Sequence, residues 1–409
     1  MTATVTAAVS GDRMSVVVIG IRDVRFEALC GEHDHLLEEW LVLWSGQPAA
    51  RRVAWSHPAW ITTWLDTYGR ASGMDFRLFF VRRGTTLVGV FALRVVPPLV
   101  PAIGGWRLEL VDDSVLSGAD PTLRDDAASD AVEALLRVPL PEGASVRLLT
   151  LRPIDETSPL LMTGHPGLSV KHVRRSCIKL ADSHAAFLSS LGRNFRGNLR
   201  KARNKLRAAG EVQVETLEAP HEMESGLARF TAVEARSWKG SAGSTMGGTP
   251  MIMALYGRAL MRLAEAGLAV VHILRVNERD AGAMISMIAG ETLFVQKIGY
   301  DEALAALAPG NLLLEAVIRD YCAARGLIAV NLVTDSDWHR NWRPSVVQTF
   351  EVNFACRGFR GTVSAWLMIP LRKRLKRLLL AMRQGAASRD PQEMAEGAKA
   401  KGSAGPDCD

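Results

Sequence analysis

The sequence lacks the cysteine patterns that mark disulfide frameworks and zinc sites. Its five cysteines are scattered over 409 residues, without a Cys-x-x-Cys pair and without histidines at ligand spacing. No stretch reaches the roughly 18 consecutive apolar residues that a membrane-spanning helix needs. Residues 1–13 contain no long apolar segment typical of a signal peptide. We therefore expect no structural metal and no membrane span, and a cytoplasmic protein.

The sequence is long enough for two domains and a tail. Its 48% hydrophobic and 22% charged residues are typical of a globular protein. The net charge is only +6, but basic residues gather around 193–207 and 372–383. Such local clusters favour anionic partners, phosphates or lipid headgroups, and we expect no coating of DNA.

Two successive stretches, 14–168 and 169–360, share one order of elements: strand, helices, antiparallel meander, helix and strand. β-branched runs predict the strands, and apolar residues spaced three or four apart predict the helices. We expect an α/β fold of two modules in tandem, each a mixed, mostly antiparallel sheet with flanking helices. The expected strands include 15–21, 76–82, 87–96, 146–151, 176–180, 212–217, 269–276, 282–289 and 292–298, and the expected helices include 26–44, 127–137, 195–209, 222–238 and 249–266.

The sequence changes character near its end. Over 365–384, Trp and Leu interleave with Arg and Lys, which predicts a basic amphipathic helix. Such a helix either packs on the domain or lies on anionic lipid, and 366–383 are our candidate for peripheral contact with the inner membrane face. Residues 385–409 contain few large apolar residues, and we expect them to be disordered.

A Pro-Gly turn between an expected strand and a helix predicts a phosphate site. The first N–H groups of a helix have no partner within it, and they favour phosphate. Folds that bind acyl-CoA use this geometry for the pyrophosphate, so the segment suggests acyl transfer. A simple connector between strand and helix is the alternative interpretation. The candidate cofactor-binding residues are Pro309, Gly310, Asn311 and Leu312.

One face of the helix expected over 195–209 carries a stripe of arginines. No acid lies between Gly192 and Gly210, so like charges repel along the helix. Two interpretations stay open: a solvated basic face, or capture of phosphate from the acyl carrier or the substrate. The candidates for phosphate capture are Arg196, Arg200 and Arg203.

Five short motifs follow one another in the second half: Asn-Phe-Arg-Gly-Asn-Leu-Arg-Lys-Ala-Arg at 194–203, Ser-Trp-Lys-Gly at 237–240, Gly-Tyr-Asp-Glu at 299–302, Ala-Pro-Gly-Asn-Leu-Leu-Leu at 308–314, and Trp338 to Trp342. In order and spacing they resemble the BioF2-like acetyltransferase domain of the CelD/BcsL family. That family is a branch of the GNAT superfamily and is related to the Fem-type peptidyltransferases. The resemblance covers about 170–355, and the first half only in its layout. A lysine usual in the family falls on or beside His339 here.

The resemblance implies transfer of an acetyl or longer acyl group from acyl-CoA, most simply acetyl-CoA, without a metal. The implied acceptor is an amine or hydroxyl of a sugar, polysaccharide or cell-envelope precursor. An aminoacyl-tRNA donor, as in the Fem relatives, is one alternative, and the basic helix would then contact RNA. A catalytically silent scaffold in polysaccharide biosynthesis is the other.

Acyl transfer needs a route for the acceptor's proton and a hydrogen-bond donor toward the thioester oxygen. Lys297, Tyr300 and Asp301 lie at the end of an expected strand, where an acceptor would approach. Asp301 is a candidate base, Tyr300 a candidate acid for the leaving thiol, and His339 a second candidate base. Structural hydrogen bonding is the alternative role for each. The candidate substrate contacts are Trp238 and Lys239, before a Gly-rich loop expected to act as a lid, and Asp335, Trp338 and Trp342.

Overall fold

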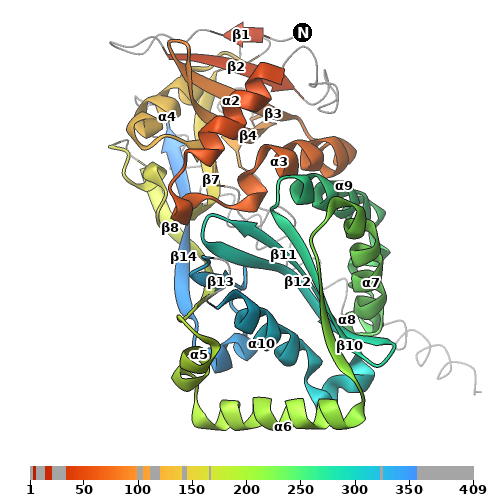
Figure 1. Cartoon of the computed structure of the whole chain (residues 1–409). Helices are drawn as coiled ribbons and strands as arrows, with labels where there is room; N and C mark the ends of the chain where they lie inside the picture. Colours follow the sequence, from red (N-terminus) through yellow and green to blue (C-terminus); the bar gives the residue numbers. More distant parts are fainter. Residues whose placement is uncertain are drawn as a thin grey trace, which may run out of the picture.

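One large sheet runs through both halves of the chain in a computed structural model (Figure 1). The basic helix expected over 365–384 and the tail over 385–409 lie outside the residues that the structure describes. Among the described helices, none is both long enough and apolar enough to cross a membrane. The described residues are 3–5, 14–20, 34–98, 105–110, 120–140, 145–164, 167–322 and 326–356.

Strands and helices alternate along the chain as the sequence predicts. The strands are β1 (Ala3–Val5), β2 (Met14–Gly20), β3 (Phe76–Arg83), β4 (Thr86–Val96), β5 (Trp106–Glu109), β6 (Thr122–Leu123), β7 (Val146–Asp155), β8 (Gly167–Lys179), β9 (Val212–Leu217), β10 (Ala269–Val276), β11 (Arg279–Ala289), β12 (Thr292–Tyr300), β13 (Ala329–Asn331) and β14 (Ser345–Ala355). The α-helices are α2 (Asp34–Ser45), α3 (Pro58–Trp64), α4 (Ala128–Arg137), α5 (His184–Ser190), α6 (Arg193–Ala209), α7 (Met223–Ala235), α8 (Trp238–Ser241), α9 (Pro250–Glu265) and α10 (Pro309–Tyr321), and two 3-10 helices border the site, η10 (Glu302–Leu307) and η11 (Asp337–Trp342).

The two halves repeat one topology. The sheet order is β1-β2-β3-β4-β5-β7-β14-β8-β13-β12-β11-β10-β9, and the described strands pair antiparallel except at β5/β7 and β12/β13. Each parallel pair is joined by a crossover that contains a helix, α4 in the first half and α10 in the second. The expected α/β fold of two tandem modules is therefore confirmed.

Strand β14, the last described strand, joins the two modules. It pairs antiparallel with β7 on one side and with β8 on the other, so the sheet continues from one module to the next. The division expected between 168 and 169 falls inside β8. The modules are thus repeats of topology within one continuous sheet.

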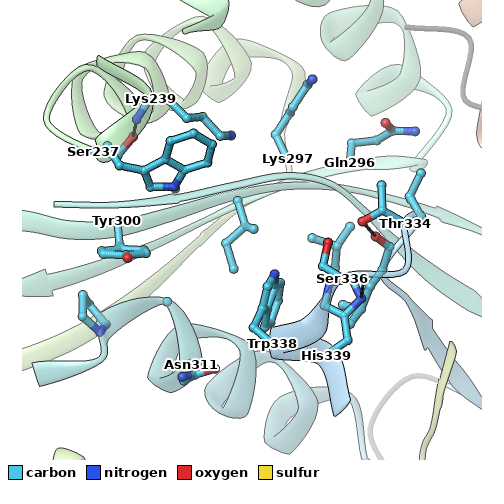
Figure 2. A pocket seen from close by; sticks show the side chains of 18 of the residues that line it. Ser237, Lys239, Gln296, Lys297, Tyr300, Asn311, Thr334, Ser336, Trp338 and His339 are labelled. Atoms are coloured by element: carbon cyan, nitrogen blue, oxygen red, sulfur yellow. Dashed lines mark hydrogen bonds between the residues drawn. The ribbon is translucent and has the colours of Figure 1, made fainter. Parts of the chain in front are cut away.

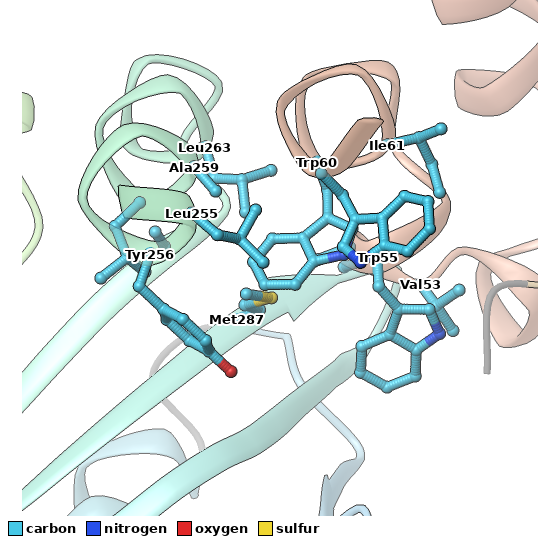
Figure 3. Close-up of a cluster of buried hydrophobic side chains, with 14 of the residues drawn as sticks. Val53, Trp55, Trp60, Ile61, Leu255, Tyr256, Ala259, Leu263 and Met287 are labelled. Atoms are coloured by element: carbon cyan, nitrogen blue, oxygen red, sulfur yellow. The ribbon is translucent and has the colours of Figure 1, made fainter. Parts of the chain in front are cut away.

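Helices α3 and α9 also connect the halves through a shared core (Figure 3). The Trp60 and Tyr256 rings meet edge to face with their centroids 5.6 Å apart. Trp55 meets Phe294 of β12 in the same way at 4.7 Å. Burying such large rings stabilises the fold strongly, because each removes a wide apolar surface from water. The first module therefore supports the strand that borders the site.

The helix expected over 222–238 is interrupted. Helix α7 ends at Ala235, and Ser237 caps the short helix α8 by accepting a hydrogen bond from the Lys239 N–H through its Oγ at 3.2 Å. Trp238 and Lys239 therefore lie in the first turn of α8. The sequence predicted these residues at the end of the long helix, but they begin a new short helix instead.

Candidate functional site

Strands β12 and β13 are paired at their beginnings and then diverge. Their parallel register covers Thr292 to Phe294 against Ala329 to Asn331. Beyond it, residues 295–300 and 332–334 line a pocket of about 830 Å³. Strand β12 remains paired with β11 on its other edge, so the edge facing the pocket presents backbone N–H and C=O groups.

Side chains from both faces of the sheet line the pocket (Figure 2). Lys239 and Lys297 lie on the side of α8, whereas Asn311 and Trp338 lie on the side of α10. Helices α7 and α9 cover the first face, and α6 and α10 cover the second. Two molecules can therefore approach one point of β12 from opposite faces.

A β-bulge lies where the pocket crosses β12. Lys297 pairs with Ile285 and Val295 with Ser286, which leaves Gln296 as the extra residue. Its amide nitrogen Nε2 is buried and has no hydrogen-bond partner among the described residues. A bulge interrupts the ladder and re-aims local backbone groups, as is common beside active sites.

Helix α10 begins at the pocket without a side-chain cap. Its N-cap residue Ala308 has a left-handed conformation (φ 50°), and Pro309 has no N–H to donate. The N–H groups of Gly310 and Asn311 therefore have no acceptor among the described residues and lie at the positive end of the helix. Leu312 does not line the pocket, because its side chain packs into the core behind the helix start.

Two lysines line the α8 side of the pocket in different electrostatic states. The Lys239 Nζ lies 3.0 Å from Oε1 of the buried Glu234, whose Oε2 accepts the Met246 N–H at 2.7 Å. Among the described residues, the half-buried Lys297 has no ion pair or hydrogen bond for its amine. Burial lowers the pKa of Lys297, and the charge of Lys239 lowers it further, while Glu234 opposes this.

Tyr300 lies at the end of β12 beside the start of α10. Its side chain is half-buried and lines the pocket. Burial raises the pKa of the Tyr300 phenol, and the nearby Glu302 carboxylate raises it further. The hydroxyl is thus held protonated, as a proton donor must be.

Asp301 does not fit the role of a base. Its carboxylate is 1% exposed and pairs with Arg236 and Arg279, at 2.7 and 2.6 Å. It also accepts the Ala303 N–H at 3.1 Å and so caps η10. Burial alone would raise the pKa of Asp301, but these partners lower it below its ordinary value. The hydrogen bonds of this carboxylate fix the end of β12, and Asp301 does not line the pocket.

His339 lines the pocket, but it is buried and its lone pair is occupied. Its Nδ1 accepts the Ser336 N–H at 3.2 Å, so this nitrogen is not free to take a proton. Burial lowers the pKa of the imidazole, although Asp335 and a backbone hydrogen bond with Thr334 act in the opposite direction. Asp335 itself accepts a hydrogen bond from the Ser176 hydroxyl at 3.0 Å and lies outside the pocket. Both residues organise the turn after β13.

Of the three tryptophans expected to contact the substrate, two line the pocket and one lies in the hydrophobic core. Trp238 and Trp338 line the pocket and are 57% and 39% exposed. Trp342 is 1% exposed and packs against Phe187 and Phe195, so it belongs to the core.

The arginine stripe on α6 lies outside the pocket lining. Arg203 pairs with the buried Glu315 of α10, which gives it a structural role. Arg196 donates to the Ser189 carbonyl at 3.4 Å, and Arg200 is exposed. Phosphate capture by Arg196 and Arg200 therefore stays a prediction, with a solvated basic face as its alternative.

Several lining residues were missed, because they come from distant parts of the sequence. Pro153 of β7 and Arg175 of β8 form one end of the pocket. Arg175 is buried, pairs with Asp155 at 3.3 Å, and lies over the Trp55 ring at 5.7 Å. No local motif marks them. Gln296 was missed as well, although a polar residue in an apolar strand is a signal that could have identified it.

A group of three or more side chains arranged to hold a metal ion does not occur in the described parts of the chain. The donors around the pocket are amines, amides and hydroxyls, which suit anions and hydrogen-bonding ligands.

Comparisons with known proteins agree with this geometry. Residues 193–340 match the family model of the acetyltransferase (GNAT) domain. The structure is similar to that of FemX, with 12% identity and a TM-score of 0.55 over 81% of this chain and 98% of that chain. L-PGS from Bacillus licheniformis is more distant, with 14% identity and a TM-score of 0.44 over 73% of this chain and 88% of that chain. The sequence matches none of the curated proteins.

The family model defines the class of one part of the chain. Residues 193–340 form a GNAT-type transferase domain. Outside that segment, the similarity to FemX is one of fold.

Proposed function

We propose that the protein transfers an acetyl or longer acyl group from acyl-CoA to an amine or hydroxyl of a sugar, polysaccharide or envelope precursor. This is the activity implied by the resemblance to the CelD/BcsL family. The observation that supports it best is the pocket between β12 and β13. It connects the uncapped start of α10 to the free edge of β12.

The donor is held at two places. Its phosphates bind at the N–H groups of Gly310 and Asn311, where the helix dipole favours negative charge. Its pantetheine arm lies along residues 295–300 of β12 and forms strand-like hydrogen bonds with the free edge. Both contacts are made by backbone, so they bind any acyl-CoA alike.

The reaction takes place at the bulge of β12. Backbone N–H groups near Gln296 donate to the thioester oxygen as it becomes an oxyanion. Lys297, in its neutral form, takes the proton of the attacking amine or hydroxyl. Tyr300 gives its proton to the departing thiolate. No covalent enzyme intermediate is needed, because positioning and charge stabilisation lower the barrier.

The acceptor spans the gap between β12 and β13, between the exposed indole of Trp238 on the α8 side and that of Trp338 on the α10 side. Trp238 on α8 and Trp338 on η11 present flat apolar faces at the pocket. Such faces pack well on the apolar side of a sugar ring, and this favours a carbohydrate acceptor.

Ligand-dependent thermal unfolding tests the donor. Acetyl-CoA, longer acyl-CoAs and free CoA should each raise Tm, because a ligand that binds the folded state stabilises it by mass action. The reaction is then tested with amino sugars as acceptors, and acetyl transfer is measured by the release of free CoA thiol. The proposal fails if none of the three ligands raises Tm.

The basic face of α6 favours a second donor, an aminoacyl-tRNA. Six cations of this helix are exposed: Arg193, Arg196, Arg200, Lys201, Lys205 and Arg207. Binding of tRNA should then weaken steeply with salt, because each neutralised phosphate releases counterions. The double variant Arg196→Ala, Arg200→Ala should make the affinity for tRNA less dependent on salt concentration. Absence of saturable tRNA binding at low salt would exclude this donor.

The peripheral membrane contact of 366–383 stays a prediction. Liposome flotation of the full chain and of a form truncated after Ser364 tests it. Binding to anionic vesicles should be lost on truncation, and equal flotation of both forms would contradict it.

A further inference from the structure

The pocket is lined by two lysine amines, and only that of Lys239 forms an ion pair with a described residue. Lys239 Nζ is held by Glu234 at 3.0 Å, and Glu234 is itself fixed by the Met246 N–H. This ion pair directs the Lys239 amine toward the Glu234 carboxylate, so Lys239 is held by a partner inside the protein. Lys297 lines the same pocket, and no described residue pairs with its amine.

Lys297 therefore has the properties of a nucleophile. Burial and the neighbouring Lys239 charge lower its pKa, which increases the neutral fraction of the amine. The charged groups that act on it are Lys239 of α8 and Glu234 of α7. It also arises from the bulge of β12, at the place assigned above to the thioester.

We propose that Lys297 is a self-acylation site, to which bound acyl-CoA transfers its acyl group when the acceptor is absent. The inference rests on the proposed function, because it needs acyl-CoA in this pocket. Nζ attacks the thioester carbonyl carbon, an N–C bond forms, and the C–S bond breaks with its electron pair on sulfur. The proton lost by the amine passes to the thiolate, directly or through Tyr300. The products are an amide on Lys297 and free CoA.

Self-acylation has a consequence for the enzyme. An amide nitrogen is neither charged nor basic, so acylated Lys297 cannot take the proton of an acceptor. The acyl chain also occupies the α8 side of the pocket. When acyl-CoA is in excess over acceptor, the fraction of inactive enzyme should therefore increase with time as Lys297 is acylated.

The test is to incubate the full chain with acetyl-CoA, without an acceptor, and to map acetyl groups by mass spectrometry over time. One acetyl group should accumulate on Lys297, at a rate that saturates with acetyl-CoA and is slowed by free CoA. Lys239 should stay unmodified. The exposed Lys205 of α6 is the control for chemical acetylation, whose rate should rise linearly with acetyl-CoA.

Calorimetry of acetyl-CoA binding separates the two ways of failing. If acetyl-CoA binds but Lys297 is acetylated no faster than Lys205, the inference is wrong and the proposed donor stands. If acetyl-CoA does not bind and Lys297 is not acetylated, both are wrong.

Two variants test the selectivity. Glu234→Gln removes the carboxylate charge that holds Lys239, so a second acetyl group should appear on Lys239. Asn311→Asp should slow acetylation of Lys297 in proportion to its weaker binding of acetyl-CoA, and leave Lys205 unaffected. The second variant keeps the inference testable if Glu234→Gln fails to fold. Equal rates at Lys297 in Asn311→Asp and the parent protein would overturn it.

Discussion

The ring of Tyr300 lies against the backbone of Gly310, where an added Cβ would come within 3.3 Å of Tyr300 Cδ1. This contact holds the end of β12 against the start of α10. It therefore joins the proposed proton donor to the proposed phosphate site. Substitution at Gly310 must shift the ring or the helix start.

Gly310→Ala should reduce activity more than stability. Alanine favours a helix over glycine by about 0.5–1 kcal/mol, which offsets the tight contact in the folding balance. The displaced Tyr300 should lower kcat about tenfold, equivalent to about 1.4 kcal/mol in the barrier. Steady-state kinetics and thermal unfolding measure the two effects. A lower Tm with unchanged kcat would contradict the role assigned to Tyr300.

Asn311→Asp should separate phosphate binding from helix stability. A carboxylate near a helix N-terminus stabilises the helix by about 0.3–1 kcal/mol, so the Tm of the free protein should hold or rise. The same charge repels the phosphates of acyl-CoA, and Kd should rise about tenfold, or about 1.4 kcal/mol. Calorimetry of acetyl-CoA binding measures this, with Asn311→Ala as the uncharged control. Unchanged affinity in the aspartate variant would place the phosphates elsewhere.

Asp301→Asn should destabilise the fold in a pH-dependent way. The folded-state pKa of Asp301 is lowered, so its stabilisation is present above the unfolded-state pKa and is lost as pH falls through the folded-state pKa. Near neutral pH we expect a loss of about 1–3 kcal/mol, typical for hydrogen bonds to a charged group. Denaturant unfolding at several pH values should show the difference shrinking in acid. A change in the pH profile of kcat, with stability unaltered, would restore Asp301 as a base.

Lys297→Met should raise stability at neutral pH while abolishing base catalysis. The folded-state pKa of Lys297 is lowered, so the unfolded chain binds the proton more tightly, and the penalty is largest below the folded-state pKa. The advantage of the methionine variant should shrink as pH rises from the folded-state to the unfolded-state pKa. Thermal unfolding between neutral and alkaline pH measures it. In the parent protein, kcat/KM should reach its plateau at a lower pH than an exposed lysine would give.

Trp342→Ala and Trp338→Ala form a matched pair. Trp342 is buried between Phe187 and Phe195, so its truncation should cost about 3–5 kcal/mol of stability. Trp338 is 39% exposed at the pocket, so its truncation should raise the acceptor KM and leave Tm nearly unchanged. Equal effects of the two on Tm would remove Trp338 from the binding rim.

The sequence predicted the order of elements well, because hydrophobic periodicity is a local property of the chain. The α10 start and Tyr300 could be located at the pocket for the same reason, since they lie within one strand-turn-helix segment. The roles of Asp301 and His339 could not be predicted. Both residue types can act as bases. In the structure, however, the Asp301 carboxylate pairs with Arg236 and Arg279, and the His339 imidazole accepts a backbone N–H in the turn after β13.

The sequence by itself determined two modules of matching topology and a helix that begins at Pro309 after β12. The tertiary structure alone decided that β14 joins the modules into one sheet, that Trp342 is core, and that the Lys297 amine lines the pocket without an ion pair to any described residue. The physical reason is the separation along the sequence of the groups that interact. Backbone conformation and amphipathicity depend on neighbouring residues, whereas burial, ion pairing and pKa depend on groups that folding brings from distant parts of the chain.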